Sequence, residues 1–235
     1  MRIHHRSSTR LLLALVSVSS LAASACGDSE GPASVAHVRF LHAAPGLATV
    51  DFRSGGTTRS AAQAFGAAWS SEVTLPTGAS AFTARLTGGA ADLATTNTTL
   101  ANSAGYSIVL AKRPTSDTLV VYTDTAATPA VDKALVRVLN VAPAAGAVDV
   151  YVTAVGADLA TATPQATAVA FLERSAYIEV ASGAQRVRLT TAGTKTVVLD
   201  LNPITLPSRS VRGIAVLDNA AGGAPLQGVV ASEKN

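Results

Sequence analysis

The hydrophobic positions of this chain follow a period of two in several segments. In residues 82–87, Phe, Ala and Leu alternate with Thr, Arg and Thr, and in residues 186–190, Val and Leu alternate with Arg and Thr. Such a period places one set of side chains in a core and the other in water, as in a half-buried strand. The apolar runs 106–110, 119–122 and 197–201 predict more deeply buried strands.

Turn signals rich in glycine separate these segments. They are Ser54-Gly55-Gly56, Pro76-Thr77-Gly78, Gly88-Gly89, Ser182-Gly183 and Gly222-Gly223. Thr, Val and Gly fill the segments between the turns, and no long stripe of period 3.6 occurs after residue 25, which argues against helices. About seven short strands in about 95 residues are typical of an antiparallel β-sandwich. We therefore expect an all-β protein.

An internal repeat indicates that the body is duplicated. The sequence VRFLHAAP at 38–45, followed by VDF, returns 98 residues later as VRVLNVAP at 136–143, followed by VDV. Seven of the sixteen positions in 38–53 are identical to their counterparts in 136–151 without a gap. A repeat of this length predicts two copies of one structural unit.

The repeat sets the expected domain boundaries. We expect one β-sandwich at 36–125 and a second at 134–235, and we interpret the stretch 126–133, which contains a proline, as the linker between them. Only ten aromatic residues serve the whole chain, so Val, Leu, Ile and Ala must fill both cores.

The N-terminus has the pattern of an export signal. Residues 1–10 carry three arginines and no acid, and residues 11–25 carry no charge. Fifteen residues are short of the roughly 20 that a membrane-spanning helix needs, but they suit the apolar region of a signal peptide. We expect residues 1–25 to be a cleaved signal peptide.

The end of this segment resembles the lipobox of bacterial lipoproteins. Small residues precede Cys26, the one cysteine of the chain, although Ala23 stands where the family usually has Leu. The resemblance implies cleavage before Cys26, a lipid on its thiol that holds the protein to a membrane, and a flexible tether at 26–35. An ordinary signal peptide that leaves Cys26 as a free thiol is the alternative. Because Gly27 is not the Asp that favours inner-membrane retention, we expect the outer membrane or cell surface.

Cleavage changes the charge balance. The full chain has 18 basic and 15 acidic residues, and residues 1–25 contain three of the arginines, so 15 of each sign remain afterwards. The sequence pI of about 9.3 therefore belongs to the export signal. Nucleic-acid binding needs a clustered basic surface, and we expect no nucleic-acid partner.

The paired motif resembles domain of unknown function 4397, which occurs in exported bacterial proteins, often as tandem copies. The resemblance rests on Val-Arg-x-Leu-(His/Asn)-x-Ala-Pro and Val-Asp-(Phe/Val), and it covers most of 36–235. Ala44 and Ala142 stand where the family often has Ser, and Asn140 where it usually has His. The family implies immunoglobulin-like sandwiches and no known activity.

The motif residues suggest structural roles. They are Arg39, Pro45, Asp51, Arg137, Pro143 and Asp149. Each proline removes a backbone donor and fits a turn at a strand end. If the flanking strands form a hairpin, each Arg lies beside the Asp twelve residues later, and we expect an exposed cross-strand bridge worth about 0–1 kcal/mol. The alternative is that each Asp accepts hydrogen bonds from the backbone of the turn.

Candidate chemistry is sparse. His37 and His42 should point to opposite faces of one strand and so cannot share a metal. His42 and Trp69 are the candidate ligand contacts, although a core position fits both. We find no catalytic motif and expect no cofactor and no metal.

These observations favour a non-catalytic envelope module, either structural or binding polysaccharide, peptidoglycan or another protein. A hydrolase with carboxylates on loops is the alternative.

Overall fold

The computed structural model describes residues 33–233 of the chain. The expected signal peptide, Cys26 and most of the expected tether lie outside these residues. The described residues form strands and one short 3₁₀ turn, so the prediction of an all-β protein is confirmed. Within residues 33–233, no helix is long and apolar enough to cross a membrane.

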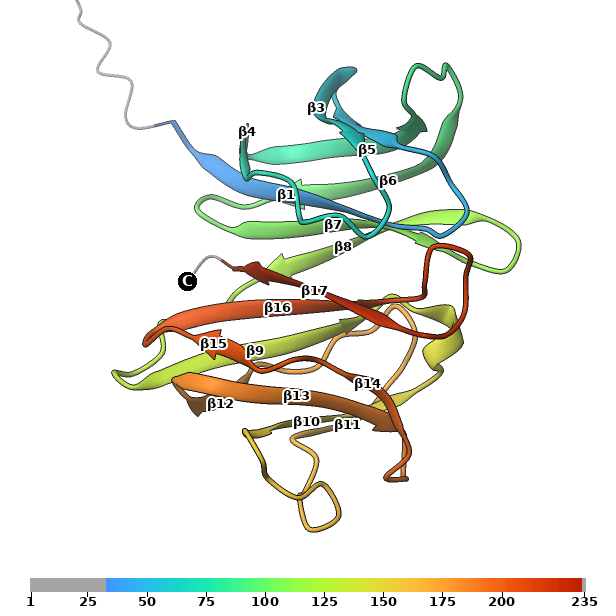
Figure 1. Cartoon of the computed structure of the whole chain (residues 1–235). Helices are drawn as coiled ribbons and strands as arrows, with labels where there is room; N and C mark the ends of the chain where they lie inside the picture. Colours follow the sequence, from blue (N-terminus) through green and yellow to red (C-terminus); the bar gives the residue numbers. More distant parts are fainter. Residues whose placement is uncertain (1–32, 234–235) are drawn as a thin grey trace, which may run out of the picture. The chain divides into compact units, whose positions relative to one another are not determined.

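The first half contains eight strands in two sheets that pack as a sandwich (Figure 1). The strands are β1 (Val35–Ala43), β2 (Val50–Ser54), β3 (Thr57–Gln63), β4 (Val73–Pro76), β5 (Gly78–Leu86), β6 (Asp92–Leu100), β7 (Gly105–Lys112) and β8 (Asp117–Asp124). One sheet has the order β4-β1-β7-β8 and the other β3-β2-β5-β6. Their facing sides enclose a core in which the Phe40 ring stacks on Phe52 at 5.0 Å.

The second half repeats this strand order with one added strand. Its strands are β9 (Lys133–Asn140), β10 (Val148–Ala154), β11 (Ala166–Val169), β12 (Ile178–Ala181), β13 (Gly183–Thr191), β14 (Val197–Asp200), β15 (Ile204–Leu206), β16 (Ser210–Leu217) and β17 (Gln227–Ser232). The sheets are β12-β9-β16-β17 and β11-β10-β13-β14, and β15 also pairs with β13. A 3₁₀ turn, Pro143–Ala145, joins β9 to β10.

The period-two pattern identified the core faces. Phe82 and Ala84 are fully buried between the two sheets, as are Val187 and Leu189 in the second sandwich. Leu86 is the exception, because it closes β5 and is 38% exposed. Residues 106–110 are buried on both faces, as their unbroken apolar run predicted.

The first motif strand of each half pairs in a way that the pattern did not indicate. β1 runs parallel to β7, and β9 runs parallel to β16, whereas the other strand pairs are antiparallel. β1 and β2 belong to different sheets, so the chain crosses from one sheet to the other at Pro45 instead of forming a hairpin. The same crossing occurs between β9 and β10.

The two sandwiches pack face to face through the sheets that hold β1 and β9 (Figure 1). The buried side chains of this contact come from β1, β7 and β8 on one side and from β9, β16, β17 and the residue that follows β9 on the other. They are Leu41, Ala43, Val109, Ala111, Tyr122, Leu139, Val141, Ala215, Leu217 and Val229. By their contacts, residues from Ala33 onward form one compact unit.

Candidate functional site

The two motif arginines meet in the contact between the sandwiches. Arg39 of β1 and Arg137 of β9 share a strand face with the apolar side chains that pack there, and they are 6% and 1% exposed. A buried guanidinium must be paired and hydrogen bonded, because its desolvation is costly. The surrounding residues satisfy that requirement.

Two carboxylates from the ends of the last strands face these arginines. Glu233 Oε1 accepts hydrogen bonds from Arg39 Nη2 and Arg137 Nε, each at 2.9 Å. Asp124 accepts a hydrogen bond from Arg137 Nη2, and its Oδ2 lies 3.5 Å from Arg39 Nη2. Each carboxylate thus contacts the arginine of its own sandwich and that of the other. We call Arg39, Arg137, Asp124 and Glu233 the charge network; its formal charge is zero.

Aromatic rings cover the network on both sides. The Arg39 guanidinium lies 4.5 Å from the centre of the Trp69 ring, and that of Arg137 lies 5.0 Å from the centre of the Tyr177 ring. The Tyr177 hydroxyl donates to Glu233 Oε2 at 2.6 Å. Burial and the bond to Glu233 raise the pKa of Tyr177, so the phenol stays protonated as a donor.

Arg137 remains charged in this environment. Burial alone would lower the pKa of Arg137, but the charges of Glu233 and Asp124 outweigh burial and raise the pKa above its ordinary value. An arginine with a raised pKa cannot serve as a proton donor or acceptor near neutral pH. The network therefore joins the two sandwiches through buried, charged hydrogen bonds.

The network has an approximate twofold arrangement with one built-in difference. Ser107 lies beside Arg39 in the β1–β7 pair, and Gly213 lies beside Arg137 in the β9–β16 pair. The Ser107 hydroxyl donates to Asp124 Oδ2 at 2.9 Å. At Gly213 a Cβ would lie 2.0 Å from Glu233 Oε1. A short acid with a serine in one sandwich thus matches a long acid with a glycine in the other.

The predicted Arg–Asp bridge within each motif is wrong. Arg39 pairs with Asp124 and Glu233, whereas Asp51 lies on β2 in the other sheet of the sandwich. The prediction assumed a hairpin around Pro45, and the crossing between sheets removes that geometry. The predicted exposed pair is instead a buried network.

The motif aspartates accept hydrogen bonds from backbone N–H groups. The alternative prediction was of this kind, but it placed the N–H groups in the turn of the motif, whereas they belong to other segments. Asp51 Oδ1 accepts from the Ala62 N–H at 2.8 Å, and Asp149 Oδ1 accepts from the Ala168 N–H at 2.8 Å. These two alanines have positive φ angles of 48° and 50°. Because such a conformation is unfavourable for alanine, the carboxylates fix an irregular point in β3 and β11.

His42 and Asn140 occupy the same position in the two motifs. Both side chains form hydrogen bonds to the backbone of the segment that crosses between the sheets. The His42 Nε2 lies 3.1 Å from the Ala48 carbonyl, and its Nδ1 accepts from the Ala44 N–H at 3.3 Å. Asn140 donates to the Gly146 carbonyl at 2.7 Å and accepts from the Ala142 N–H at 3.3 Å. Each side chain clamps the crossing between the sheets.

His42 is fully buried within this clamp. Burial lowers its pKa, which keeps the ring in the neutral form that can donate and accept at once. His42 and His37 point to opposite faces of β1, and the His37 Nδ1 lies 2.6 Å from Glu72 Oε1. Within residues 33–233 no group of three or more His, Cys, Asp or Glu could hold a metal.

Sequence reasoning missed five residues of the contact. They are Ser107, Asp124, Tyr177, Gly213 and Glu233. Trp69, a candidate ligand contact, packs against the apolar part of this contact, and its Nε1 donates to the Val229 carbonyl at 3.5 Å. The placement of Asp124 and Glu233 at the end of each half's last strand was a signal available in the sequence.

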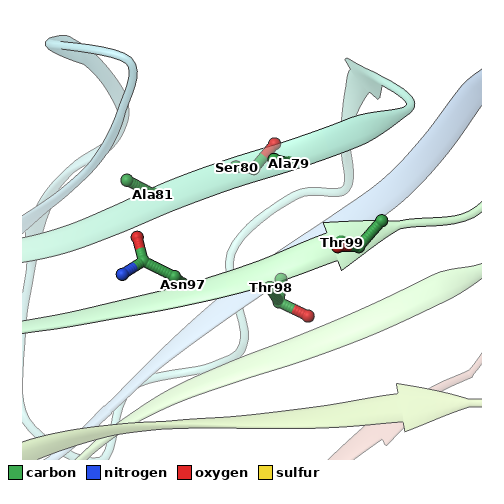
Figure 2. A pocket seen from close by; sticks show the side chains of 6 residues that line it. All are labelled: Ala79, Ser80, Ala81, Asn97, Thr98 and Thr99. Atoms are coloured by element: carbon green, nitrogen blue, oxygen red, sulfur yellow. The ribbon is translucent and has the colours of Figure 1, made fainter.

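The outer sheet of the first sandwich has a shallow hollow of about 420 Å³, lined by small and polar residues (Figure 2). Ala79 and Ala81 of β5 lie opposite Thr99 and Asn97 of β6, so small side chains on one strand border polar ones on the next. Figure 2 shows the Asn97 amide lying beside the Ala81 methyl group. The surface is exposed and carries no charged residue in the hollow itself.

The fold and the buried contact define an all-β protein of two face-to-face sandwiches. Residues 36–151 match the model of a domain of unknown function, DUF4397, so a DUF4397 domain is found there. The match spans the first sandwich and continues through β9 to Tyr151 in β10. No curated protein matches the chain.

One solved structure with limited likeness is a leucine-rich repeat protein from Bacteroides thetaiotaomicron. It is 15% identical, the alignment covers 82% of this chain and 27% of that chain, and the TM-score is 0.25. This chain thus spans about a quarter of that protein, and a likeness of this size carries no argument.

Proposed function

We propose that this chain is an exported lipoprotein, anchored to the outer membrane or cell surface through lipid on Cys26, whose body is a non-catalytic module that binds or braces a component of the cell envelope. The envelope component is polysaccharide, peptidoglycan or a protein. The proposal requires no cofactor, no metal and no nucleic acid.

One observation carries the non-catalytic part of the proposal: the polar residues of the repeated motif serve the fold. Arg39 and Arg137 join the sandwiches, Asp51 and Asp149 hold irregular backbone, and His42 clamps a crossing. A catalytic group must reach substrate, whereas these groups are buried or engaged with backbone. The polar residues of the repeated motif are therefore already committed to structure.

The packing supports a fixed display of two surfaces. The sheets that hold β1 and β9 face each other, which leaves the sheets that hold β5 and β13 as the outer layers of the two sandwiches. A flexible pair of domains could close on one partner and gain avidity. A pair held by a buried network presents its two outer sheets in a constant relation, which suits bracing between partners.

We also propose that the second half is a second copy of the family domain. The two halves share their strand order, the parallel pairing of the first strand and the Asp that holds an irregular point. The test is a crystal structure of the chain: superposition of the halves strand by strand supports the duplication, and a different strand order contradicts it.

The binding proposal is tested by sedimentation of the mature chain, residues 26–235 with Cys26→Ser, with separated peptidoglycan, outer polysaccharide and membrane-protein fractions. Saturable co-sedimentation with one fraction supports the module and names its partner class. Ala81→Arg tests the outer sheet of the first sandwich, and it is a fair probe because Arg186 fills the matching place in the second. Absence of binding to all three fractions contradicts a binding role.

A further inference from the structure

A hollow of about 470 Å³ lies beside β3, at the edge of the first sandwich. Six consecutive residues, 59–64, line one side, and residues of the loop before β4 line the other. β3 is the last strand of its sheet and pairs only with β2, so one edge of its backbone has no strand partner (Figure 1). The hollow is therefore a groove along a free sheet edge.

Arg59 is the charged residue of this groove. No hydrogen bond or ion pair within residues 33–233 engages its guanidinium, and its Nε is buried without a partner. Other arginines of the same sheet are engaged: Arg53 donates to Thr58 Oγ1 at 3.1 Å, and Arg85 pairs with Asp92. A buried guanidinium N–H without an acceptor is unfavourable, so a ligand that brings an acceptor to Arg59 would gain binding free energy there.

The lining supplies no counter-charge of its own. No Asp or Glu lines the groove. The acids nearest to the lining in sequence are engaged elsewhere: Glu72 with His37 at 2.6 Å, and Asp51 with the Ala62 N–H at 2.8 Å. Gln63 donates to the Phe40 and Ala68 carbonyls, which fixes the loop beside the groove. The groove thus has a loop fixed by hydrogen bonds and a positive charge, that of Arg59, without a counter-charge.

The second sandwich does not repeat this arrangement. Ser60 lies opposite Phe52 and Ala166 lies opposite Val150, so Gln165 takes the place of Arg59. Gln165 turns its side chain back and accepts from the Val152 N–H at 2.8 Å. The free guanidinium is specific to the first sandwich.

We propose that this groove binds an extended polypeptide segment that carries an acidic side chain. The segment adds to the free edge of β3, and its carboxylate pairs with Arg59. Small lining residues such as Ala61 and Ala64 allow a backbone to approach closely, and strand addition supplies the main-chain hydrogen bonds. No aromatic ring lines the groove, and stacking on such a ring is what a sugar ring would need. This inference rests on the proposed binding function and names its partner class.

The test uses the mature chain with Cys26→Ser and a fluorescein-labelled peptide, Thr-Val-Glu-Val-Thr-Val, followed by fluorescence anisotropy. We expect saturable binding that weakens about tenfold in Arg59→Gln, because a hydrogen bond to a charged group is at the stronger end of the range. Replacing the peptide's Glu with Gln should cause a similar loss with the unsubstituted chain and little further loss with Arg59→Gln. Arg113→Gln is the matched control, since Arg113 is exposed and its side chain has no partner within residues 33–233.

Two further probes separate the alternatives. A peptide with N-methyl groups on alternate residues keeps its charge but cannot form the strand ladder, so it should not bind. Oligogalacturonate carries carboxylates on sugars; binding that depends on Arg59 for this probe and not for the peptide overturns the inference in favour of an acidic glycan. Equal peptide affinity for the unsubstituted chain and Arg59→Gln also overturns it.

The envelope fractions separate this inference from the proposed function. If the chain binds a fraction but not the peptide, the groove assignment fails and the module stands. If it binds neither, both fail.

Discussion

Glu233 packs so closely against Gly213 that a side chain at position 213 should disrupt the charge network. In Gly213→Ser the added Cβ would lie 2.0 Å from Glu233 Oε1 and 2.9 Å from its Cδ, so the carboxylate must leave. Arg39 and Arg137 then share a single counter-charge, Asp124, in a buried site. Removing one member of a buried pair costs about 3–5 kcal/mol. The flexible Glu233 side chain can shift to relieve the clash but not the loss of charge, so we expect Gly213→Ser to lower the free energy of unfolding by about 3 kcal/mol.

The compensating change follows from the other sandwich. Glu233→Asp together with Gly213→Ser recreates the serine and aspartate found at Ser107 and Asp124, where the hydroxyl bonds the carboxylate at 2.9 Å. We expect the double variant to be more stable than the sum of the single changes by about 1.5 kcal/mol, within the range for directly coupled residues.

Urea unfolding of the mature chain with Cys26→Ser, followed by near-ultraviolet circular dichroism, measures all four states of this cycle. Gly228→Ser is the control on the same pair of strands, because the three atoms nearest to its Cβ would all belong to the Leu201 side chain, the closest at 2.8 Å. It should be less harmful, and Glu233→Asp should not rescue it. If Gly213→Ser leaves the free energy of unfolding unchanged, or if the two changes simply add, the proposed packing of Glu233 against Gly213 is incorrect.

Three further changes test other parts of the molecule. His42→Asn should alter the unfolding free energy by less than about 1 kcal/mol, because Asn140 makes the matching hydrogen bonds in the second sandwich. Since burial lowers the pKa of His42, the unfolded state binds a proton at a higher pH than the folded state does, and the free energy of unfolding should fall as the pH drops below about 6.5. The free energy of unfolding of His42→Asn should depend less on pH in this range. An unchanged pH profile would count against the neutral clamp. Tyr177→Phe removes a 2.6 Å bond to a carboxylate and should cost about 1–3 kcal/mol in urea unfolding; a neutral result would mean that water replaces the hydroxyl. Cys26→Ser should abolish labelling by radioactive palmitate and move the exported protein from the membrane to the soluble fraction, whereas retained labelling would refute lipidation at Cys26.

The strands could be predicted because the pattern that marks a strand is local in sequence. A period of two identifies the faces of a strand, and the repeated motif indicated that each half would begin alike. The pattern does not say which sheet a strand joins. Long-range pairing decides that question, so the crossing at Pro45 was taken for a hairpin and the Arg39–Asp51 bridge was predicted from it.

The charge network escaped prediction for a related reason. Arg39 on β1 alternates with buried residues, and a polar residue in that position normally marks the face in water. Leu41 and Ala43 lie on the same face as Arg39, and two apolar residues beside a charge were the available sign that another layer covers it. Asp124 ends β8 and Glu233 follows β17, and the sequences of these two strands are not alike, so the repeat did not align the two acids.

The contact between the sandwiches buries apolar and charged side chains from both halves. Each sandwich alone would expose a face with buried apolar residues such as Leu41 or Leu139, and large exposed apolar faces favour association. The charge pairs across the contact work in the same direction, because Glu233 bonds Arg39 and Asp124 bonds Arg137 of the other sandwich. Separating the halves would leave both arginines without these acceptors as well as exposing the apolar faces, so we expect the two halves to unfold together.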